Sequence, residues 1–411
     1  MDPNDWSEVQ LDLDTGICLW LGAGVSTHLS RSIGGKLPQW GELTEALERE
    51  AGVVVDPESK DNFPERLQQC TRELGTAPVR RKIARAVYGE LCVQIAKFAH
   101  DNVDNLAVLP AAVIQLAALG WRANPIVNFN IETFSSMLAA RPAGPCRILP
   151  YRSHEAAKAG RYVEQEAGSD FARIVYHPHG AANYSGEAVM TSSEYAAHDG
   201  SLAYLLSVSA AFENHLWIVG MSLDDVYLRN QLAAHRNQIH RIRWFNTKVE
   251  LDKHAEWALT NDIKPVAVDW PAFWHRIEDS LEPQIRISGA MSAWYYVIET
   301  ALSELFHGTQ TEQMAEVAAK LSAFGITVPP SNSEGEYRKV FERNEAEDLL
   351  PRNFSPEKIT DNIATIMRNE VEFVTTLIDQ LHTTFGPAAR DIVSALELAK
   401  PLRISMRHMN L

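Results

Sequence analysis

Short apolar runs bounded by polar or glycine-containing turns recur along the first 280 residues of the chain. The clearest run, residues 17–21 (Ile-Cys-Leu-Trp-Leu), has the length and continuous hydrophobicity of a buried strand. Similar runs begin near residues 125, 173, 215 and 264. Segments with helical spacing of apolar residues separate them, around residues 43–51 and through most of 64–120. This alternation predicts an α/β fold, with a parallel sheet and helices on both faces.

From about residue 286 the apolar residues keep helical spacing only. Residues 293–306 read as an amphipathic helix. A longer helix is expected from Ser355-Pro356, where serine can cap and proline suits the first helical position, to Phe385, before Gly386-Pro387. The sequence therefore predicts two domains: an α/β domain over 1–285, with a helical insertion at about 60–120, and an all-helical C-terminal appendage over 286–411.

Composition narrows the class of protein. The 411 residues suffice for two domains, and an apolar share of 45% can fill a sizeable core. A net charge of −15 opposes direct nucleic-acid binding. No apolar stretch approaches the ~20 residues that span a bilayer, and the first residues do not resemble a signal peptide, so we expect a cytoplasmic protein without membrane association. The cysteines form no Cys-x-x-Cys pair, which argues against a disulfide framework; they are Cys18, Cys70, Cys92 and Cys146.

A glycine-containing turn, Gly22-Ala23-Gly24-Val25-Ser26, follows the first predicted strand. Two glycines one residue apart let the backbone turn sharply and approach a ligand, and Ser26 can open a helix whose N–H groups face a phosphate. A plain tight turn would use the same residues. The third glycine and the downstream acidic residue of ordinary dehydrogenases are missing. The turn favours a Rossmann-like nucleotide-binding sheet and disfavours hydride transfer.

Polar turns follow three further predicted strands, at the ends where ligands bind to parallel sheets. They are Asn128-Phe129-Asn130-Ile131-Glu132, Tyr176-His177-Pro178-His179-Gly180 and Gly220-Met221-Ser222-Leu223-Asp224-Asp225. Together with the glycine turn and the later segment 34–38, they resemble the sirtuin family. Its members carry Gly-Ala-Gly-x-Ser, Gly-x-Pro, Asn-x-Asp, His-Gly and Gly-x-Ser-Leu in this order. The resemblance covers about residues 16–280.

The departures from the family pattern are informative. Deacylase sirtuins hold a zinc ribbon of two Cys-x-x-Cys pairs, but the interval 181–219 contains no cysteine, so the usual four-thiolate zinc site is impossible and no metal is expected. Glu132 replaces the aspartate of Asn-x-Asp. The segments 189–195 and 217–225 are similar to the zinc-free bacterial branch, whose members are NAD hydrolases of anti-phage defence.

The resemblance implies a site for NAD, as substrate, in the domain 1–285. Asn130 and His179 would be catalytic, with a neutral imidazole suited to general-base work near pH 7. His177 competes with His179, Asn128 competes with Asn130, and the aspartates of the last turn could cap the next helix. The implied NAD-binding residues are Gly22, Ala23, Gly24 and Ser26 at the pyrophosphate, Glu132 at the nicotinamide, and Gly220, Ser222 and Asp224 near the adenosine ribose.

The expected activity is that of an NAD glycohydrolase, which releases nicotinamide and ADP-ribose as an abortive-infection effector. The alternatives are an NAD-dependent protein deacylase and a catalytically silent nucleotide-binding sensor. NADP or another nucleotide as substrate, a cyclic product, and the trigger all stay open. Since an uncontrolled NAD hydrolase would harm its host, we expect a homo-oligomer that assembles with a HerA-type ATPase, with a short-Argonaute partner as a less favoured arrangement.

Overall fold

The computed structural model describes residues 3–54, 62–102, 108–143, 146–150, 173–181, 189–197, 205–206 and 215–280, with most of 289–301. The chain forms two compact units. The first comprises Met1–Arg31, Lys36–Tyr88 and Gln115–Leu281, and the second comprises Ser32–Gly35, Gly89–Ile114 and Glu282–Leu411.

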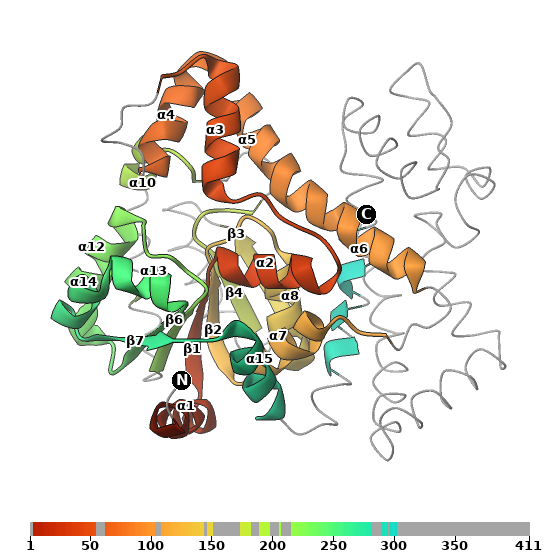
Figure 1. Cartoon of the computed structure of the whole chain (residues 1–411), viewed down its shortest axis with the longest axis vertical. Helices are drawn as coiled ribbons and strands as arrows, with labels where there is room; N and C mark the ends of the chain where they lie inside the picture. The colour runs from red at the N-terminus through yellow and green to blue at the C-terminus, as the bar shows by residue number, and fades with distance from the viewer. Residues whose placement is uncertain are drawn as a thin grey trace. The chain divides into compact units, whose positions relative to one another are not determined.

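A seven-stranded parallel sheet forms the centre of the first unit, in the order β3-β4-β2-β1-β5-β6-β7 (Figure 1). The predicted strands are confirmed, and β3 and β6 are two that the sequence did not predict. The strands are β1 Ile17–Leu21, β2 Ala123–Asn128, β3 Cys146–Pro150, β4 Arg173–His177, β5 His215–Val219, β6 Ile242–Asn246 and β7 Ile263–Ala267. With its helices, the sheet has the predicted Rossmann-like α/β architecture.

The order of the strands reverses between β1 and β5. From β1 the chain adds β2, β3 and β4 on one side, then returns to place β5 on the other side of β1. Leu21 is in register with Asn128 of β2 and with Val219 of β5, so these three strands end level with one another. In open α/β sheets, such a reversal is where ligands bind, beyond the carboxyl ends of the strands.

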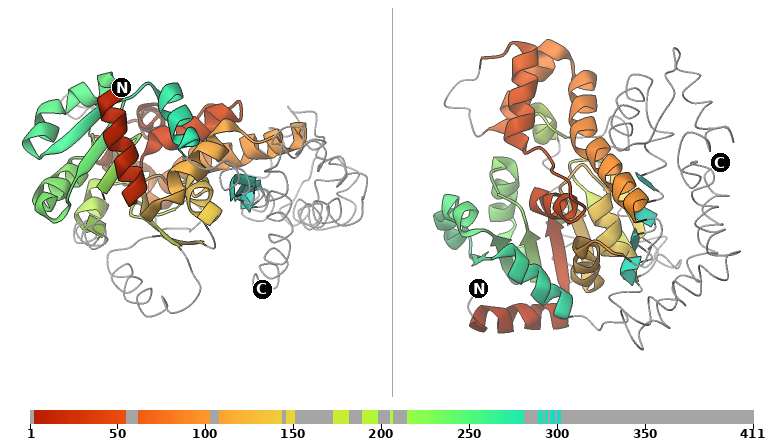
Figure 2. Two further views of the ribbon diagram at one scale, coloured as in Figure 1. Left: turned by 90° about the horizontal axis from the view of Figure 1, so that it is seen from below. Right: turned by 45° about the vertical axis from the view of Figure 1, so that its right-hand side comes forward.

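Helices surround the sheet (Figure 2). The helices of the first unit before β2 are α1 Pro3–Thr15, α2 Ala23–Ser32, α3 Trp40–Ala51, α4 Phe63–Leu74, α5 Thr76–Ala84 and α7 Ala111–Trp121. Those after β2 are α8 Phe134–Ala140, α10 Ser192–Ala197, α12 Val226–Ala234, α13 Lys248–Lys253, α14 Ala255–Thr260 and α15 Trp270–Asp279.

Helices cover both faces of the sheet, as predicted. Successive residues of a strand point to opposite faces, so neighbouring residues of β6 show the packing on each face. Trp244 of β6 belongs to a core shared with α12, α13 and α14 through Leu228, Leu251 and Ala258. The next residue, Phe245, points the other way. Its ring lies 5.4 Å from that of Phe273 in α15.

A helical lobe of α3, α4 and α5 has a core of its own. Its buried residues include Leu47, Leu67, Cys70, Val79 and Ile83, and Ile131 and Met190 join them from outside the lobe. Inside this lobe Arg66 pairs with Glu48 through two hydrogen bonds of 2.6 and 2.7 Å, with both side chains buried. Because Ile131 follows Asn130, the lobe packs directly on one of the predicted site turns.

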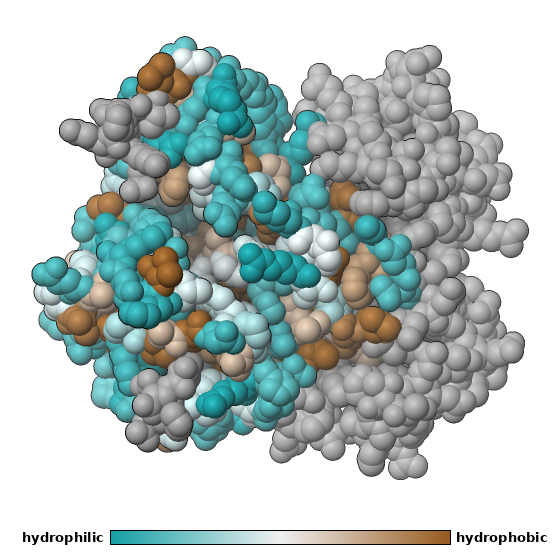
Figure 3. All heavy atoms as spheres, viewed as in Figure 1, coloured by the Kyte–Doolittle hydropathy of each residue, from teal (hydrophilic) through white to brown (hydrophobic). Residues whose placement is uncertain are grey.

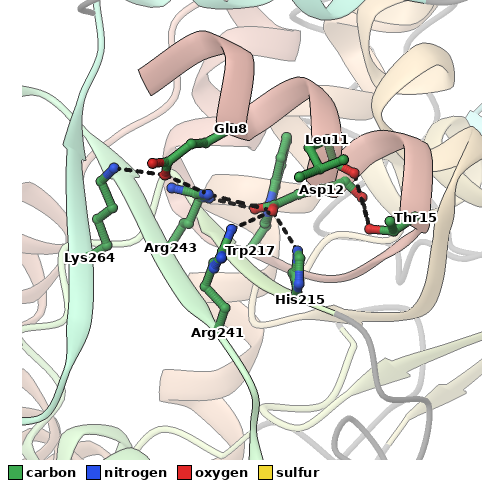
Figure 4. A network of polar contacts seen from close by, with 9 residues as sticks. All are labelled: Glu8, Leu11, Asp12, Thr15, His215, Trp217, Arg241, Arg243 and Lys264. Atoms are coloured by element: carbon green, nitrogen blue, oxygen red, sulfur yellow. Dashed lines mark hydrogen bonds and ion pairs between the residues drawn. The ribbon is translucent and has the colours of Figure 1, made fainter. Parts of the chain in front are cut away.

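Helix α1 lies at the N-terminal ends of the strands, away from those turns (Figure 1). Its Asp12 is buried against Arg243 of β6 and accepts a 3.1 Å hydrogen bond from Trp217 of β5 (Figure 4). Glu8, one turn earlier, pairs with Arg243 at 3.1 Å and with Lys264 of β7 at 3.0 Å. Two acidic residues of α1 thus hold the starts of three strands.

Of the second unit, the structure describes α6 Glu90–Asp101 and a helical segment within residues 289–301. The rings of Phe98 and Trp294 meet edge to face at 5.8 Å. The described residues 293–301 are helical, in agreement with the start of the predicted helix 293–306. The rest of the predicted appendage, including the helix from Ser355 to Phe385, lies outside the described residues.

The surface of the described residues is largely hydrophilic on the face shown in Figure 3. The large apolar side chains that remain exposed come from different elements, among them Leu11, Val54, Val226, Val249 and Leu259. No described helix has both the length and the hydrophobicity to cross a membrane.

Candidate functional site at the carboxyl edge of the sheet

The four turns singled out in the sequence follow β4, β2, β1 and β5, which are neighbours in the sheet. Because all these strands are parallel, the turns meet along one edge. The N–H of Phe129 donates to Leu21 O at 3.0 Å, and the N–H of Gly22 donates to Val219 O at 2.9 Å. The turn after β1 is therefore bonded to its neighbours on both sides.

The two glycines of the first turn allow a close approach to the turn after β5. The N–H of Gly24 donates to Gly220 O at 2.8 Å. A Cβ on Gly22 would lie 2.6 Å from Gly220 O, and one on Gly24 would lie 2.9 Å from the Gly220 Cα. This backbone packing accounts for both glycines by itself, and it occupies the N–H groups of Gly22 and Gly24.

Asn130 is the residue that joins the turn after β2 to the glycine turn. Its side-chain amide donates to Gly22 O at 2.9 Å, and its side chain is nearly buried. Asn128 is fully buried, and its Nδ2 donates to Ser135 Oγ and Ser136 Oγ at 2.9 and 2.8 Å. Of the two competing asparagines, Asn130 is the one that contacts the predicted nucleotide turn.

His177 belongs to a closed ring of hydrogen bonds beneath the site. Its Nδ1 lies 3.0 Å from Asn130 O, and its Nε2 lies 2.7 Å from Ser136 Oγ. Asn128 Nδ2 donates to the same Oγ, and Asn128 Oδ1 accepts from the N–H of Asn130 at 2.9 Å. Burial lowers the pKa of His177 from 6.5 to about 4, so the ring is neutral at pH 7. This histidine fixes the turn after β4 to the turn after β2.

His179, two residues later, lies at the edge of the sheet with 16% of its side chain exposed. Its Nε2 is 3.8 Å from Asp225 Oδ2, and its Nδ1 is 3.5 Å from the hydroxyl of Tyr195. The rings of Phe129 and Tyr195 meet it edge to face at 5.2 and 5.0 Å. Of the two competing histidines, His179 is the one that is partly exposed.

Ser26 and Glu132 contact each other. Ser26 Oγ donates to Glu132 Oε1 at 2.7 Å, and the backbone N–H of Ser135 donates to Glu132 Oε2 at 3.0 Å. The Glu132 carboxylate is fully buried at the start of α8. Both residues thus join α2 to α8 behind the glycine turn.

In the turn after β5, Ser222 Oγ accepts the backbone N–H of Asp224 at 3.4 Å. Asp224 pairs with His254 at 2.8 Å. Burial raises the pKa of Asp224, but hydrogen bonding to His254 outweighs burial and keeps it below its usual value. Asp225 caps α12, because its Oδ1 accepts the N–H of Leu228 at 3.0 Å. The capping role considered for this aspartate is confirmed.

Sequence reasoning missed two residues of this edge, Tyr195 and His254, and gave Asp225 no contact with a histidine. Burial and the charge of Asp225 raise the pKa of Tyr195 well above its usual value, so its hydroxyl stays protonated. The strands that precede His179 and Asp225 are not adjacent, since β2 and β1 lie between them. Strand order alone therefore gave no signal for this contact.

The assembled edge offers an amide (Asn130), an imidazole between a carboxylate and a phenol (His179), and a turn of close-packed glycines. Among the described residues, no group of three or more His, Cys, Asp or Glu is placed to hold a metal ion. Neither a family model nor a curated protein matches this chain.

Proposed function

We propose that this protein cleaves the nicotinamide–ribose bond of NAD with water as acceptor, as an NAD glycohydrolase. One observation carries most of the argument. The four turns that resemble sirtuin motifs, far apart in the sequence, follow four adjacent parallel strands at the reversal of strand order, where α/β sheets bind nucleotides.

The chemistry of the edge fits this reaction. Nicotinamide is a good leaving group, so the protein must chiefly orient the ribose, tolerate a cationic transition state and accept a proton. His179 is the proposed base, and Asn130, which can both donate and accept, orients the attacking water or the ribose hydroxyls. The proposed NAD contacts at Gly22, Ala23, Gly24, Gly220, Ser222 and Asp224 rest on the sirtuin resemblance. Ser26 and Glu132 support the site from behind through their mutual hydrogen bond.

The decisive experiment is incubation of the purified full chain with NAD alone, with nicotinamide release followed by chromatography. We expect release by the wild type and a loss of about 10²- to 10⁴-fold in His179→Ala. Asn130→Asp keeps the side-chain shape and is expected to lose activity too, and melting curves check that both variants fold. Release that requires an acyl-lysine peptide would favour the deacylase, and binding of NAD without release would favour the sensor.

The biological setting of the proposal rests on the same resemblance. An abortive-infection effector that forms a homo-oligomer with a HerA-type ATPase would explain how NAD cleavage is restrained. Co-expression with such an ATPase, followed by size-exclusion chromatography and an assay of NAD loss during phage infection, tests this setting apart from the chemistry.

A further inference from the structure

The two ring nitrogens of His179 face different protein groups. Nε2 faces the Asp225 carboxylate at 3.8 Å, and Nδ1 faces the Tyr195 hydroxyl at 3.5 Å. We propose that Asp225 is a positioning residue, which holds His179 in the tautomer protonated on Nε2 and leaves Nδ1 as the base. This role rests on the proposed NAD cleavage, because it concerns the protonation state that His179 needs as the base.

The side chain of Asp225 is held in place because Asp225 is the N-cap residue of α12. Its Oδ1 accepts the N–H of Leu228 at the start of α12, at 3.0 Å, so Oδ2 is the oxygen left to face the imidazole. A carboxylate accepts hydrogen bonds and cannot donate one. The nitrogen that faces it must therefore carry the proton for the contact to be favourable, which assigns the proton to Nε2.

Tyr195 supports this geometry from the other side. Its raised pKa keeps the hydroxyl protonated, and that hydroxyl is hydrogen-bonded to the Asp225 side chain, so its proton does not occupy the lone pair of Nδ1, 3.5 Å away. The tyrosine ring stacks on Tyr227 of α12 at 5.3 Å, and the Phe129 ring meets the imidazole edge to face. Two aromatic rings, those of Tyr195 and Phe129, thus hold the plane of the His179 ring.

The arrangement accounts for each proton and electron pair of the reaction. A water molecule gives a proton to Nδ1 as an electron pair of its oxygen forms a bond to the ribose C1′. The C1′–N bond breaks, and its electrons leave with neutral nicotinamide. The imidazolium that results lies beside the Asp225 carboxylate, and an opposite charge at this distance stabilises it.

The test is Asp225→Asn, which separates the charge from the cap. Asparagine still caps α12 well, because its Oδ1 can accept from Leu228. Its NH₂ group then takes the place of Oδ2 and donates toward Nε2, which favours the wrong tautomer. In serine proteases the equivalent exchange lowers kcat by about 10⁴-fold. Here we expect a loss in kcat of at least about 100-fold, with KM for NAD changed less than about threefold.

Histidine NMR on the full chain supplies a readout that does not depend on NAD. Among the described residues, the ionisable groups that face His179 include Asp225 at the N-cap of α12, Tyr195 of α10 and His177 of its own segment. In Asp225→Asn we expect the ¹⁵N shifts to move toward the Nδ1–H form and the imidazole pKa to fall by about one unit. Asp269→Asn is the matched control, since Asp269 caps α15 in the same way at 3.0 Å.

The outcomes separate this inference from the proposed function. An unchanged tautomer and pKa of His179 in Asp225→Asn would overturn the inference, even in a protein that cleaves NAD. If the wild type releases no nicotinamide, the proposed function fails, and the NMR comparison still decides whether Asp225 sets the tautomer. Equal NMR changes in Asp269→Asn would also count against the specific pairing.

Discussion

His177 and His179 stand two residues apart in one turn, yet they lie in opposite environments. Both ring nitrogens of His177 are bonded inside the fold, to Asn130 O and Ser136 Oγ, and the ring is fully buried. His179 reaches the edge of the sheet, where its ring is partly exposed. The first histidine therefore stabilises the turn, and the second is the one that we propose as the base.

Because His177 is buried and His179 is not, we predict that protonation of His177 makes the free energy of unfolding depend on pH. Its pKa is 6.5 when unfolded and about 4 when folded, so the folded state resists protonation. Stability is complete above about pH 6.5, falls as the pH drops from 6.5 to 4, and stops falling below 4. The loss should amount to roughly 3 kcal/mol over this window. Urea unfolding should show a flatter pH dependence in His177→Gln, whereas His275→Gln, at an exposed histidine, should match the wild type. Equal slopes in all three proteins would refute this assignment.

The glycine turn makes a second residue-level prediction. A Cβ at position 22 would lie 2.6 Å from the backbone of the turn after β5, so Gly22→Ala must push two strand ends apart. We expect a loss of about 3 kcal/mol in the free energy of unfolding. Gly41→Ala in α3 meets no atom within 4 Å, and it should be neutral or stabilise by about 0.5 kcal/mol. Comparable losses in the two variants would contradict the packing explanation.

At the level of elements, α10 connects the helical lobe to the site. Ser192 Oγ donates to Glu65 of α4 at 2.9 Å, and Glu194 pairs with Arg80 of α5. The next residue, Tyr195, contacts His179. One short helix is thus anchored by the lobe on one side and touches the proposed base on the other.

We therefore expect Glu194→Ala to loosen the segment 189–197. Glu194 also accepts the N–H groups of Met190 and Thr191 at 2.8 and 2.9 Å, and alanine removes these bonds. Hydrogen–deuterium exchange should accelerate in this segment, and kcat/KM for NAD should fall by about tenfold as Tyr195 shifts. Lys248→Ala breaks an exposed pair on α13 and should change neither measurement. Unchanged exchange in Glu194→Ala would show that the anchor is unimportant.

The strands show which elements could be predicted from the sequence and which could not. The strands found in advance are short, mostly apolar and followed by distinctive turns. β6 was missed because Arg243 interrupts its apolar run, and that arginine is buried only because Asp12, far away in the sequence, pairs with it. β3 lies at the edge of the sheet and ends in Pro150, so it carries little strand signal.

The candidate site also has parts that the sequence predicted and parts that it could not predict. Local patterns identified the turns that hold Asn130 and His179, because each turn follows a strand directly. The contact of His179 with Asp225 depends on side chains that reach across the ends of β2 and β1, which no local pattern encodes. Likewise, the hydrogen bond between Ser26 and Glu132 joins residues 106 positions apart.

On the scale of the whole first unit, the candidate site and the α1 network lie at opposite ends of the same strands (Figures 1 and 4). The network involves residues near the starts of β5, β6 and β7, and the site turns follow strand ends. A change in the network should therefore alter the stability of the sheet without altering the geometry at the other end.

Asp12→Asn tests this separation of stability from function. The change leaves the guanidinium of Arg243, which is fully buried, without its charged partner on Asp12, and breaking a buried pair costs about 3 kcal/mol or more. The urea midpoint should fall accordingly, while KM for NAD at low temperature should stay within about twofold, because no site residue moves. Asp14→Asn on the same helix is the matched control, since Asp14 is half exposed and pairs with Arg122 at the surface. A changed KM in Asp12→Asn with an unchanged midpoint would mean that α1 acts on the site and not on the stability of the sheet.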